Sequence, residues 1–546
     1  MIFSAQYGGL WKTSNGGSTW SHIFSAIWAK DVAYAQGNTV IATIFGDNKV
    51  ASESGIWVSP DGGTTWGQAS IDYPLGRGGV YGISVAPDDR RKVYVATDYG
   101  IATSRDNGIT WEHTRLEGNP RSIIALPGNK AMALATTGVF RSDGGPWRRI
   151  KEGNFGFSNG DTFKLIDALP TDRDKVFILQ DYDNLYLYEV AADRFSAIRV
   201  PGRGRSRNPF IRVSLRPSPA QGFELWLGNG VHLLRRTCSD IDDARRTGVF
   251  NWASFGRDDG IHDDTGFMGL DSAHLPVLYG SDGGIFKPAN SQATFWQRAA
   301  VTGSGLNSYQ ITALGGTEYT AGDLSLYFST QDNGSIWSSG DAGITWPRAG
   351  SPEGSFVQVT PFAANPTSAT VAWNSIRGAD PRWTSMFGSG NLGTQWEVPA
   401  NSPGSRFGFL TGFSIPIFVA PSAWVRYRFP PEGGSPELYR SRDNGNTWVK
   451  VAEINLEQRG VPIPSRELVF GAFRAPGSRP GGGERIGIIK FDPRIPVYGA
   501  ANLINLPDDG SLGIRATEFD FRAVFGVDPT NPDYIIAPDI VNGLIK

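Results

Sequence analysis

The chain has one cysteine, Cys238, among its 546 residues, so an internal disulfide framework is excluded. It has no apolar run close to the roughly 20 residues that a membrane-spanning helix requires. Neither sign of charge dominates, because 51 lysine and arginine residues stand against 53 aspartate and glutamate residues. Nucleic-acid-binding proteins normally carry a basic stripe, so nucleic acid is not expected as a partner. The N-terminal residues lack a basic start followed by an apolar stretch, and no signal peptide is visible.

What the chain does have is glycine, proline and tryptophan, with 69, 35 and 17 residues, while charged residues make up only 19%. Many turns and few long charged helices indicate an all-β protein with short strands. At this length a single hydrophobic core stops growing, so we expect two domains or one large repeat array.

An octapeptide of the form S/T-x-D/N-x-G-x-T-W recurs along the chain, and each copy is called a box below. Good copies contain Asn15 and Trp20, Asp61 and Trp66, Asp106 and Trp111, Asp341 and Trp346, and Asp443 and Trp448. Weaker copies end at Trp147, Trp296 and Trp396, and one with an insertion runs from Thr237 to Trp252. Most neighbouring boxes are about 45 residues apart, which is the length of one four-stranded propeller blade.

Each position of the box has a structural reason. We expect the Asp or Asn side chain to bond backbone amides two residues on, with the leading Ser or Thr doing the same more weakly. Glycine supplies the positive φ that other residues avoid. The tryptophan buries its ring against the neighbouring sheet. The boxes are therefore interpreted as folding elements rather than active sites.

The segments between boxes share one pattern of strands, which divides the chain into units. The first unit ends near residue 25 and lacks its first strand, and six more begin near residues 31, 81, 121, 163, 210 and 266. A second series begins near residues 309, 356, 409, 467 and 518, and its last member stops before its box, which favours a fragment. The predicted fold is a seven-bladed β-propeller over 1–302 and a second, incomplete propeller of about four and a half blades over 303–546. A single ring of ten or more blades is the alternative.

With these boxes the sequence resembles bacterial Asp-box (BNR) proteins of the sortilin-like and xyloglucanase-like type, which have tandem propellers. The resemblance covers most of the chain and is closest over residues 257–346, through RDDGIHDDTGFMGLD, LYGSDGGIF, GLNSYQITAL and LYFSTQDNGSIWSSGDAGITW. In the family pattern an H-x-D-x-H segment opens a blade. Here His262 and Asp264 are present, but Gly266 stands in the place of the second histidine. The resemblance implies an extracellular or cell-surface location, and membership alone supplies no function.

The densest polar cluster lies within residues 258–274, and its candidate binding residues are Asp259, His262, Asp264 and His274. Carboxylates and imidazoles together could bind Ca²⁺ or a transition metal, or act as acids and bases. The spacing matches no established metal motif, so no cofactor is predicted and Ca²⁺ is left open.

Three acidic turns between the second and third strands of their units carry Asp98, Asp282 and Asp332. In xyloglucanase-type relatives a T-D-x-G-G turn of this kind carries a catalytic aspartate, and Asp98, followed by Tyr99 and Gly100, resembles it most. An inverting glycosidase needs two carboxylates roughly 6.5–9.5 Å apart. Recurrence at equivalent positions also fits a role in building the blade.

Two functions of different classes follow. The favoured one is a binding or scaffold module that presents a propeller face to a polysaccharide or a protein. The alternative is a glycoside hydrolase with paired carboxylates in a cleft between propellers. A sialidase is disfavoured, because the only Arg-Ile-Pro segment, Arg494–Pro496, lies late in the chain instead of near its start.

Overall fold

The computed structural model divides the chain into two compact units, Met1–Ser308 and Tyr309–Lys546. In the first unit the structure describes residues 1–299 except 6–7, 27, 45–53, 72–78, 156–163, 181–183, 202–208, 218–221, 229–231, 247–250, 263 and 282. In the second unit it describes the strands β28 to β47 and residues 496–499. The domain boundary predicted between 302 and 303 lies outside the described residues.

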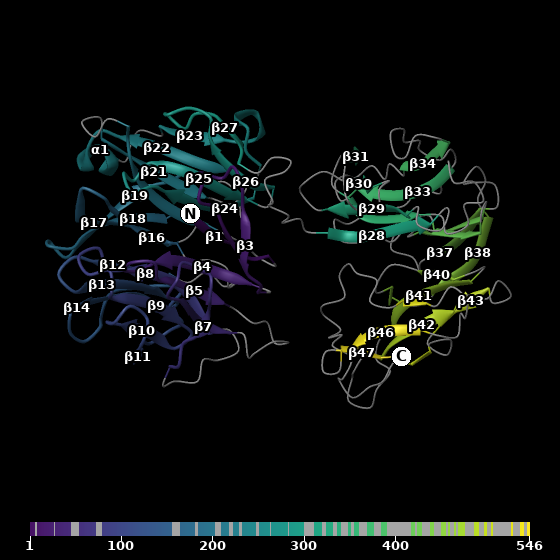
Figure 1. The fold of residues 1–546 in the computed structure, drawn as a ribbon, viewed down its shortest axis with the longest axis horizontal. Coiled ribbons are helices and arrows are strands. Elements are labelled where there is room, and N and C mark those ends of the chain that lie inside the picture. Colours follow the sequence, from purple (N-terminus) through teal and green to yellow (C-terminus); the bar gives the residue numbers. More distant parts are fainter. Residues whose placement is uncertain are drawn as a thin grey trace. The chain divides into compact units, whose positions relative to one another are not determined.

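The first unit is all-β and consists of seven antiparallel sheets, called blades 1 to 7 in chain order (Figure 1). Blades 1 to 3 contain β1 Ile2–Ala5, β2 Gly9–Lys12 and β3 Ser21–Phe24; β4 Ala29–Tyr34, β5 Val40–Ile44, β6 Gly55–Ser59 and β7 Gly67–Gln68; and β8 Val80–Val85, β9 Val93–Thr97, β10 Gly100–Ser104 and β11 Glu112–Arg115.

Blades 4 and 5 contain β12 Ser122–Leu126, β13 Lys130–Ala135, β14 Gly138–Asp143 and β15 Arg148–Glu152; and β16 Ile166–Leu169, β17 Asp172–Leu179, β18 Asn184–Glu189 and β19 Arg194–Arg199. Blades 6 and 7 contain β20 Phe210–Leu215, β21 Phe223–Gly228, β22 Leu233–Cys238, α1 Ile241–Arg245 and β23 Trp252–Phe255; and η3 Arg257–Asp259, β24 Thr265–Leu270, β25 Pro276–Ser281, β26 Gly284–Pro288 and β27 Trp296–Arg298. The seven-bladed propeller predicted from the repeats is thus confirmed.

The burial of the strands follows their position in the blade. In blade 3 the middle strands β9 and β10 are buried at every residue, whereas the outer strand β11 is largely exposed. A radial sheet is covered on both faces by its neighbours, so its middle strands need apolar or small residues on both sides. The sequences VYVAT and GIATS meet that need, and the polar EHTR of β11 suits the rim.

The ring closes after seven blades. Phe3, Trp11 and Trp20 of blade 1 pack in one apolar cluster with Leu278 and Ile285 of blade 7. On its other side, blade 1 packs against blade 2 in a separate cluster. Because the first and seventh sheets bury each other's apolar faces, the alternative of a single ring of ten or more blades is ruled out.

Blade 1 has three described strands where the other blades of the first unit have four. A box follows β2 just as boxes follow β6 and β10, so β1 and β2 correspond to the second and third strands of a blade. This agrees with the predicted absence of a first strand there. The other first strands begin at residues 29, 80, 122, 166, 210 and 265, within three residues of the starts that the repeats predicted.

The boxes form tight turns, although their hydrogen bonds differ from those expected. The aspartate or asparagine Oδ1 accepts from the threonine amide four residues on, at 2.9, 2.8 and 2.9 Å in the boxes of Asn15, Asp61 and Asp106. The leading hydroxyls of Thr13, Ser59 and Ser104 accept from the amides of Gly17, Gly63 and Gly108. For the Asp or Asn side chain the predicted bond to amides two residues on was therefore wrong, because the glycine-containing turn lets it reach the threonine that begins the return. For the leading hydroxyl the prediction is confirmed in two boxes, since Thr13 and Ser104 also accept from the amides of Asn15 and Asp106 at 3.3 and 3.4 Å.

Two of the box tryptophans, Trp66 and Trp111, bond back to their own turns. The indole nitrogens of Trp66 and Trp111 donate to the carbonyls of Gly63 and Gly108 at 3.2 and 3.0 Å, and Trp20 and Trp111 are buried. The eroded copy that ends at Trp296 keeps the side-chain bond, because Asn290 Oδ1 accepts from the Thr294 amide at 3.1 Å, but Trp296 Nε1 is buried without a hydrogen-bond partner among the described residues. The boxes of Asp341 and Trp346 and of Asp443 and Trp448 lie outside the described residues.

The second unit is described by its strands. They are β28 Ile311–Glu318, β29 Leu324–Thr330, β30 Ile336–Ser339 and β31 Arg348–Gly350; β32 Gly354–Val359, β33 Ser368–Ser375 and β34 Thr384–Ser389; β35 Ile417–Ala420, β36 Ala423–Arg428, β37 Glu437–Ser441, β38 Val449–Ile454 and β43 Val497–Tyr498; β39 Glu457–Gln458, β40 Ile463–Ser465, β41 Leu468–Ala475, β42 Arg485–Lys490 and β44 Ile504–Asn505; and β45 Gly526–Val527, β46 Ile535–Asp539 and β47 Gly543–Ile545. They pair into five sheets.

Candidate functional site

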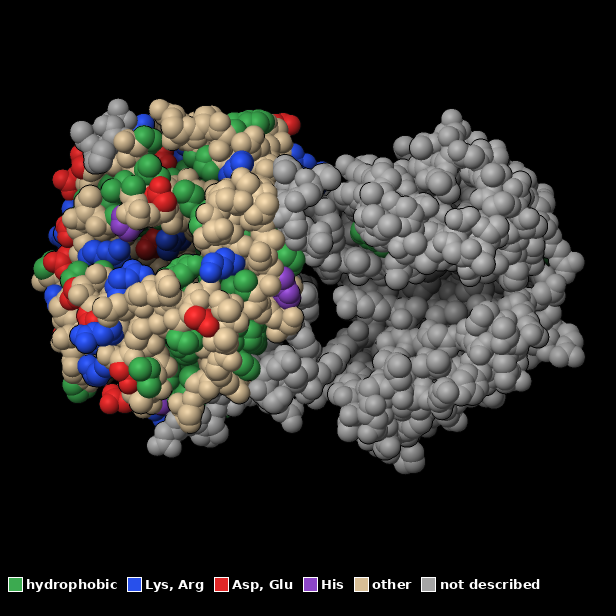
Figure 2. Space-filling model, in the orientation of Figure 1, with side chains coloured by type: hydrophobic (Ala, Val, Ile, Leu, Met, Phe, Trp, Pro, Cys, Tyr) green, Lys and Arg blue, Asp and Glu red, His purple; other side chains and the backbone are tan. Residues whose placement is uncertain are grey.

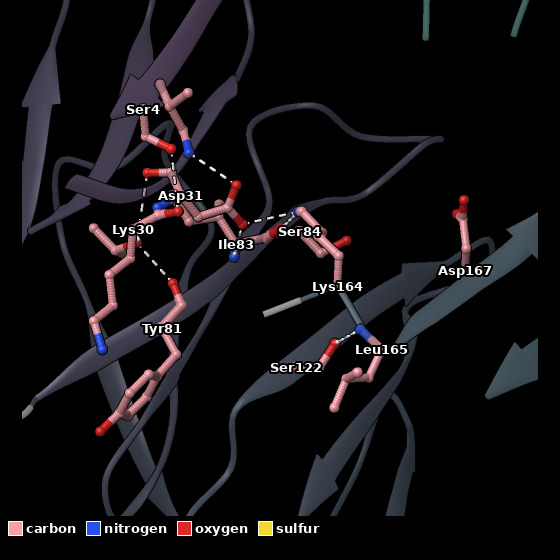
Figure 3. A network of polar contacts seen from close by, with 12 residues as sticks. Ser4, Lys30, Asp31, Tyr81, Ile83, Ser84, Ser122, Lys164, Leu165 and Asp167 are labelled. Carbon is pink, nitrogen blue, oxygen red and sulfur yellow. Dashed lines mark hydrogen bonds and ion pairs between the residues drawn. The ribbon is translucent and has the colours of Figure 1, made fainter. Parts of the chain in front are cut away.

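The innermost strands of blades 2 to 6 are joined by side chains that bond the backbone of the next blade (Figure 3). The acceptor–donor pairs are Asp31 Oδ2 with the Ile83 amide at 2.8 Å, Ser84 Oγ with Ala125 at 2.9 Å, Ser122 Oγ with Leu165 at 3.0 Å, and Asp167 Oδ2 with Val213 at 2.9 Å. Each bond satisfies a backbone donor that has no ladder partner on that side. The same bonds fix the side chains that surround the axis of the ring.

One ion pair crosses this central region. Lys164, next to the first strand of blade 5, places its Nζ 2.8 Å from Oδ2 of Asp31 in blade 2, and it also donates to the Ile83 carbonyl of blade 3 at 3.2 Å. Figure 2 shows that the first unit is hollowed at its centre, with lysine and arginine side chains around the hollow and an acidic side chain at depth. The centre of the ring is therefore polar and charged.

Asp98 lies in the turn between β9 and β10 of blade 3, and both of its carboxylate oxygens have partners. Oδ1 accepts a hydrogen bond from the Tyr81 hydroxyl at 2.6 Å, and Oδ2 accepts from the Gly79 amide at 2.8 Å. The Arg121 guanidinium, just before β12 of blade 4, lies 3.8 Å from Oδ1. The side chains of Arg121 and Asp98 are 15% and 16% exposed. If Asp98 accepted a proton during a reaction, one of these partners would have to move away from the carboxylate.

Aromatic rings and cations surround this aspartate. The guanidinium carbon of Arg121 lies 3.7 Å from the centre of the Tyr81 ring, and Lys30 Nζ lies 4.4 Å from the same centre. Lys30 is also 5.2 Å from the Trp28 ring. Tyr99, the residue after Asp98, is 41% exposed. The group Trp28, Lys30, Tyr81, Asp98, Tyr99 and Arg121 is called the Asp98 cluster below.

Of the three acidic turns singled out in the sequence, only that of Asp98 is described. Asp282 and Asp332 lie outside the described residues. A pair of carboxylates at glycosidase separation therefore stays a prediction. The sequence reasoning did not select Lys30, Tyr81 or Arg121, which come from three successive repeats near the start of the first strand of each. Superposing the repeats on one another would have grouped them.

The four residues predicted to form a binding cluster in blade 7 are not brought together as one group. Asp259 Oδ2 accepts from the Gly256 amide at 2.9 Å and so closes the 3₁₀ turn η3. Asp264, with φ 61°, precedes β24, and the His262 ring lies against Gly283. His274 lies beyond the other end of β24, in the turn that leads to β25. Six residues of extended strand separate His274 from Asp264, about 20 Å at the rise of a β-strand.

His274, in blade 7, instead lies near charged residues of blades 5 and 6. Burial lowers the pKa of its imidazole, with Arg173 of blade 5 and Arg212 of blade 6 acting in the same direction and Asp167 and Asp271 opposing it. The Arg212 guanidinium is itself 3.3 Å from Asp167 Oδ2. Neither arginine was singled out in the sequence, because nothing local marks them and the ring alone brings three blades together.

Metal binding was left open in the sequence. Within the part of the chain that the structure describes, no group of three histidine, cysteine, aspartate or glutamate side chains is placed to hold a metal ion. Asp263 and Asp282 are outside that part. The same described part contains no helix with the length and apolar content needed to span a bilayer.

Solved structures similar to this chain are β-propeller proteins. An ancestral GH74 enzyme is 13% identical, with 90% of this chain and 80% of that chain covered and a TM-score of 0.45. The GH74 xyloglucanase from Xanthomonas campestris is 12% identical, with coverages of 100% and 95% and a TM-score of 0.44. PorZ, a surface component of the type-IX secretion system of Porphyromonas gingivalis, is 12% identical, with coverages of 89% and 62% and a TM-score of 0.45.

Likeness at these identities assigns neither an activity nor a ligand to this chain. No protein-family model and no curated protein matches the sequence. The function therefore has to be argued from the described residues.

Proposed function

We propose that the first propeller is a non-catalytic binding module that holds a polysaccharide at the Asp98 cluster. The observation that carries this proposal is the contrast between two adjacent residues. The carboxylate of Asp98 is bonded to Tyr81, Gly79 and Arg121, whereas the ring of Tyr99 beside it is 41% exposed. The aspartate thus builds the site, and the tyrosine faces the ligand.

The chemistry around Tyr99 suits a sugar. An exposed aromatic face offers apolar area for the C–H side of a sugar ring, and a few fixed polar groups beside it give orientation. Arg121 and Lys30 are held against the Tyr81 ring, so the donors at the site are ordered before a ligand arrives. Ordered groups lose less conformational entropy on binding than free side chains do.

The proposal includes the more specific interpretation of the sequence. The chain would be an Asp-box (BNR) protein of the sortilin-like and xyloglucanase-like type, located outside the cell or at its surface, with the second unit as an incomplete propeller. The box turns, which share one hydrogen-bond pattern in blades 1, 2 and 3, support that reading. The competing possibility is that the same face binds a protein instead of a polysaccharide.

The test is affinity electrophoresis and calorimetry of the full chain with xyloglucan and mixed-linkage β-glucan. We expect binding that weakens about tenfold or more in Tyr99→Ala, because the stacking ring is removed; tenfold corresponds to about 1.4 kcal/mol. Tyr34→Ala is the matched control, because Tyr34 is 36% exposed and lies at the other end of the first strands, in β4. Equal affinities for both variants, or no binding to either glucan, would refute the proposal.

The hydrolase alternative is tested on the same polysaccharides. We expect no release of reducing ends by the full chain. If reducing ends appear, and Asp98→Asn removes the activity without lowering the unfolding temperature, the catalytic reading replaces the binding one.

A further inference from the structure

Two cations of the Asp98 cluster are stacked on aromatic rings. The ammonium of Lys30 lies 4.4 Å from the centre of the Tyr81 ring and 5.2 Å from that of Trp28. The guanidinium carbon of Arg121 lies 3.7 Å from the centre of the Tyr81 ring. A ring attracts a cation through its quadrupole but has no net charge of its own. The rings therefore hold these cations in place without neutralising them.

A third cation lies beside Tyr99. Arg115 is the last residue of β11, and in the sheet it is paired with Gly100, the residue after Tyr99. The amide of Leu116 donates to the Tyr99 carbonyl at 2.9 Å, which fixes the backbone next to Arg115 against that of Tyr99. Arg115 is exposed. Its guanidinium is therefore available to a ligand that contacts the Tyr99 ring.

Among the described residues, the region around Tyr99 carries more positive than negative charge. Its cations are Lys30, Arg115, Arg121 and Arg149, and its carboxylates are those of Asp98, Glu117 and Glu152. Asp98 lies 3.8 Å from Arg121, and Glu117 and Glu152 lie 3.3 and 3.0 Å from Arg149. Four cations thus stand against three carboxylates.

Screening increases this excess. The side chains of Glu117 and Glu152 are 69% and 82% exposed, so water and salt weaken their fields. Lys30, in contrast, is 6% exposed, and the field of a charge that is partly removed from water reaches further. Arg121 and Asp98 are buried to a similar extent and largely offset each other. Lys30 and Arg115 therefore set the sign of the charge near the Tyr99 ring.

We propose that the polysaccharide held at the Asp98 cluster is acidic and contains uronate sugars. This inference rests on the proposed function, in which the Tyr99 ring stacks on a sugar. The guanidinium of Arg115 offers paired donors that match the two oxygens of a carboxylate. Lys30 acts through its field, because a mostly buried ammonium favours an anion nearby without touching it.

The experiment compares polygalacturonate with the same polymer after methyl esterification of its carboxyl groups. The two polymers have the same sugar rings and differ in charge. In calorimetry with the full chain at neutral pH, we expect the acid form to bind about tenfold more tightly than the ester, since hydrogen bonds to charged groups are the stronger ones. Raising the salt from about 0.1 M to about 1 M shortens the Debye length from about 10 Å to about 3 Å and should reduce this preference.

Two variants test the cations, each with a matched control. In Arg115→Gln the preference for the acid form should fall about threefold or more, the size expected for one exposed charge pair. Arg105→Gln should retain it, because Arg105 is 62% exposed and follows β10 at the other end of the β10–β11 pair.

Lys30→Met, which retains the apolar stem, should also lower the preference for the acid form. Lys92→Met should not, since Lys92 is 5% exposed and lies 5.2 Å from the Tyr94 ring, but at the other end of β9 from Asp98. The salt titration of the parent chain needs no variant, so it tests the inference even if Lys30→Met lowers the unfolding temperature.

Equal affinities for the acid and the ester, or a preference that salt does not change, would overturn the inference. An equal effect of Arg115→Gln and Arg105→Gln would do the same, as would acid binding that Tyr99→Ala does not weaken. Glucan binding at Tyr99 without a preference for the acid form would leave the proposed function intact and overturn only this inference. An absence of glucan binding would overturn the proposed function itself.

Discussion

Lys164 Nζ lies 2.8 Å from Asp31 Oδ2, and the pair joins blade 5 to blade 2 across two intervening blades. Asp31 also accepts from the Ile83 amide of blade 3 and the Val32 amide of its own strand. One carboxylate thus links three blades of the ring. The side chains of Lys164 and Asp31 are 31% and 11% exposed, so water screens the pair only in part.

Replacing Lys164 by methionine should lower the stability of the propeller. Methionine retains the apolar stem of lysine but leaves Asp31 without its cation, and we expect a loss of about 1–2 kcal/mol, between the values for exposed and buried pairs. The measurement is the unfolding midpoint of the full chain. In a double-mutant cycle with Asp31→Asn, the second change should cost less once Lys164 is gone, whereas purely additive effects would contradict the coupling.

The hydroxyl of Thr43 should contribute more to the stability of the propeller than the shape of the side chain does. Thr43 is fully buried; its Oγ1 donates to the Tyr81 carbonyl at 2.7 Å and accepts from the Asp31 amide at 3.1 Å. Thr43→Val preserves the volume and leaves both backbone groups unsatisfied, so we expect a loss of about 1–3 kcal/mol in unfolding free energy. Thr43→Ser preserves the hydroxyl and should lose less. A serine variant as unstable as the valine variant would show that the methyl group matters as much as the hydrogen bonds, and would contradict this prediction.

The box of Asp61 should make stability depend on pH. Bonds from the Thr65 amide and hydroxyl lower the pKa of Asp61 from 3.8 to about 2. The folded state therefore binds this proton less readily than the unfolded state does, so the stabilisation is complete above about pH 4 and is lost as the pH falls towards 2. In Asp61→Asn the difference in unfolding temperature from the parent chain should shrink over that window. Asn15→Asp, in the box that naturally has asparagine, should gain the same dependence of stability on pH. If the difference in unfolding temperature between Asp61→Asn and the parent chain does not change with pH, this account is contradicted.

Cys238 should be unreactive in the folded chain. Its side chain is fully buried, and burial raises the pKa of the thiol to about 12. The thiolate, which is the reactive form, is therefore scarce at neutral pH. With a thiol reagent such as Ellman's, we expect no modification of the native chain and one thiol per chain in denaturant. Rapid modification under native conditions would mean that β22 opens easily.

Much of the first propeller could be read from the sequence, because the box is a local signal. The residues that close each turn, such as Asp106, Gly108 and Trp111, are close neighbours in the chain, and their spacing sets the length of a blade. Six of the first strands were placed within three residues in this way. The residue whose amide donates to the Asp or Asn side chain was not predicted correctly, since it depends on how wide the turn is.

The candidate sites were predicted far less well. Asp98 was found by its resemblance to a known turn, but its partners Tyr81 and Arg121 were not, and His274 was grouped with His262 and Asp264 when it lies near Arg173 and Arg212. The sequence by itself determined the repeat and the strand order within each blade, because those depend on contacts between near neighbours. That the ring closes after seven blades was decided by the tertiary structure, in which Phe3 and Trp20 pack against Leu278 and Ile285. Only the tertiary structure decided which charged side chains meet at the centre, because closing the ring places residues such as Asp31 and Lys164 in contact although they are far apart in the chain.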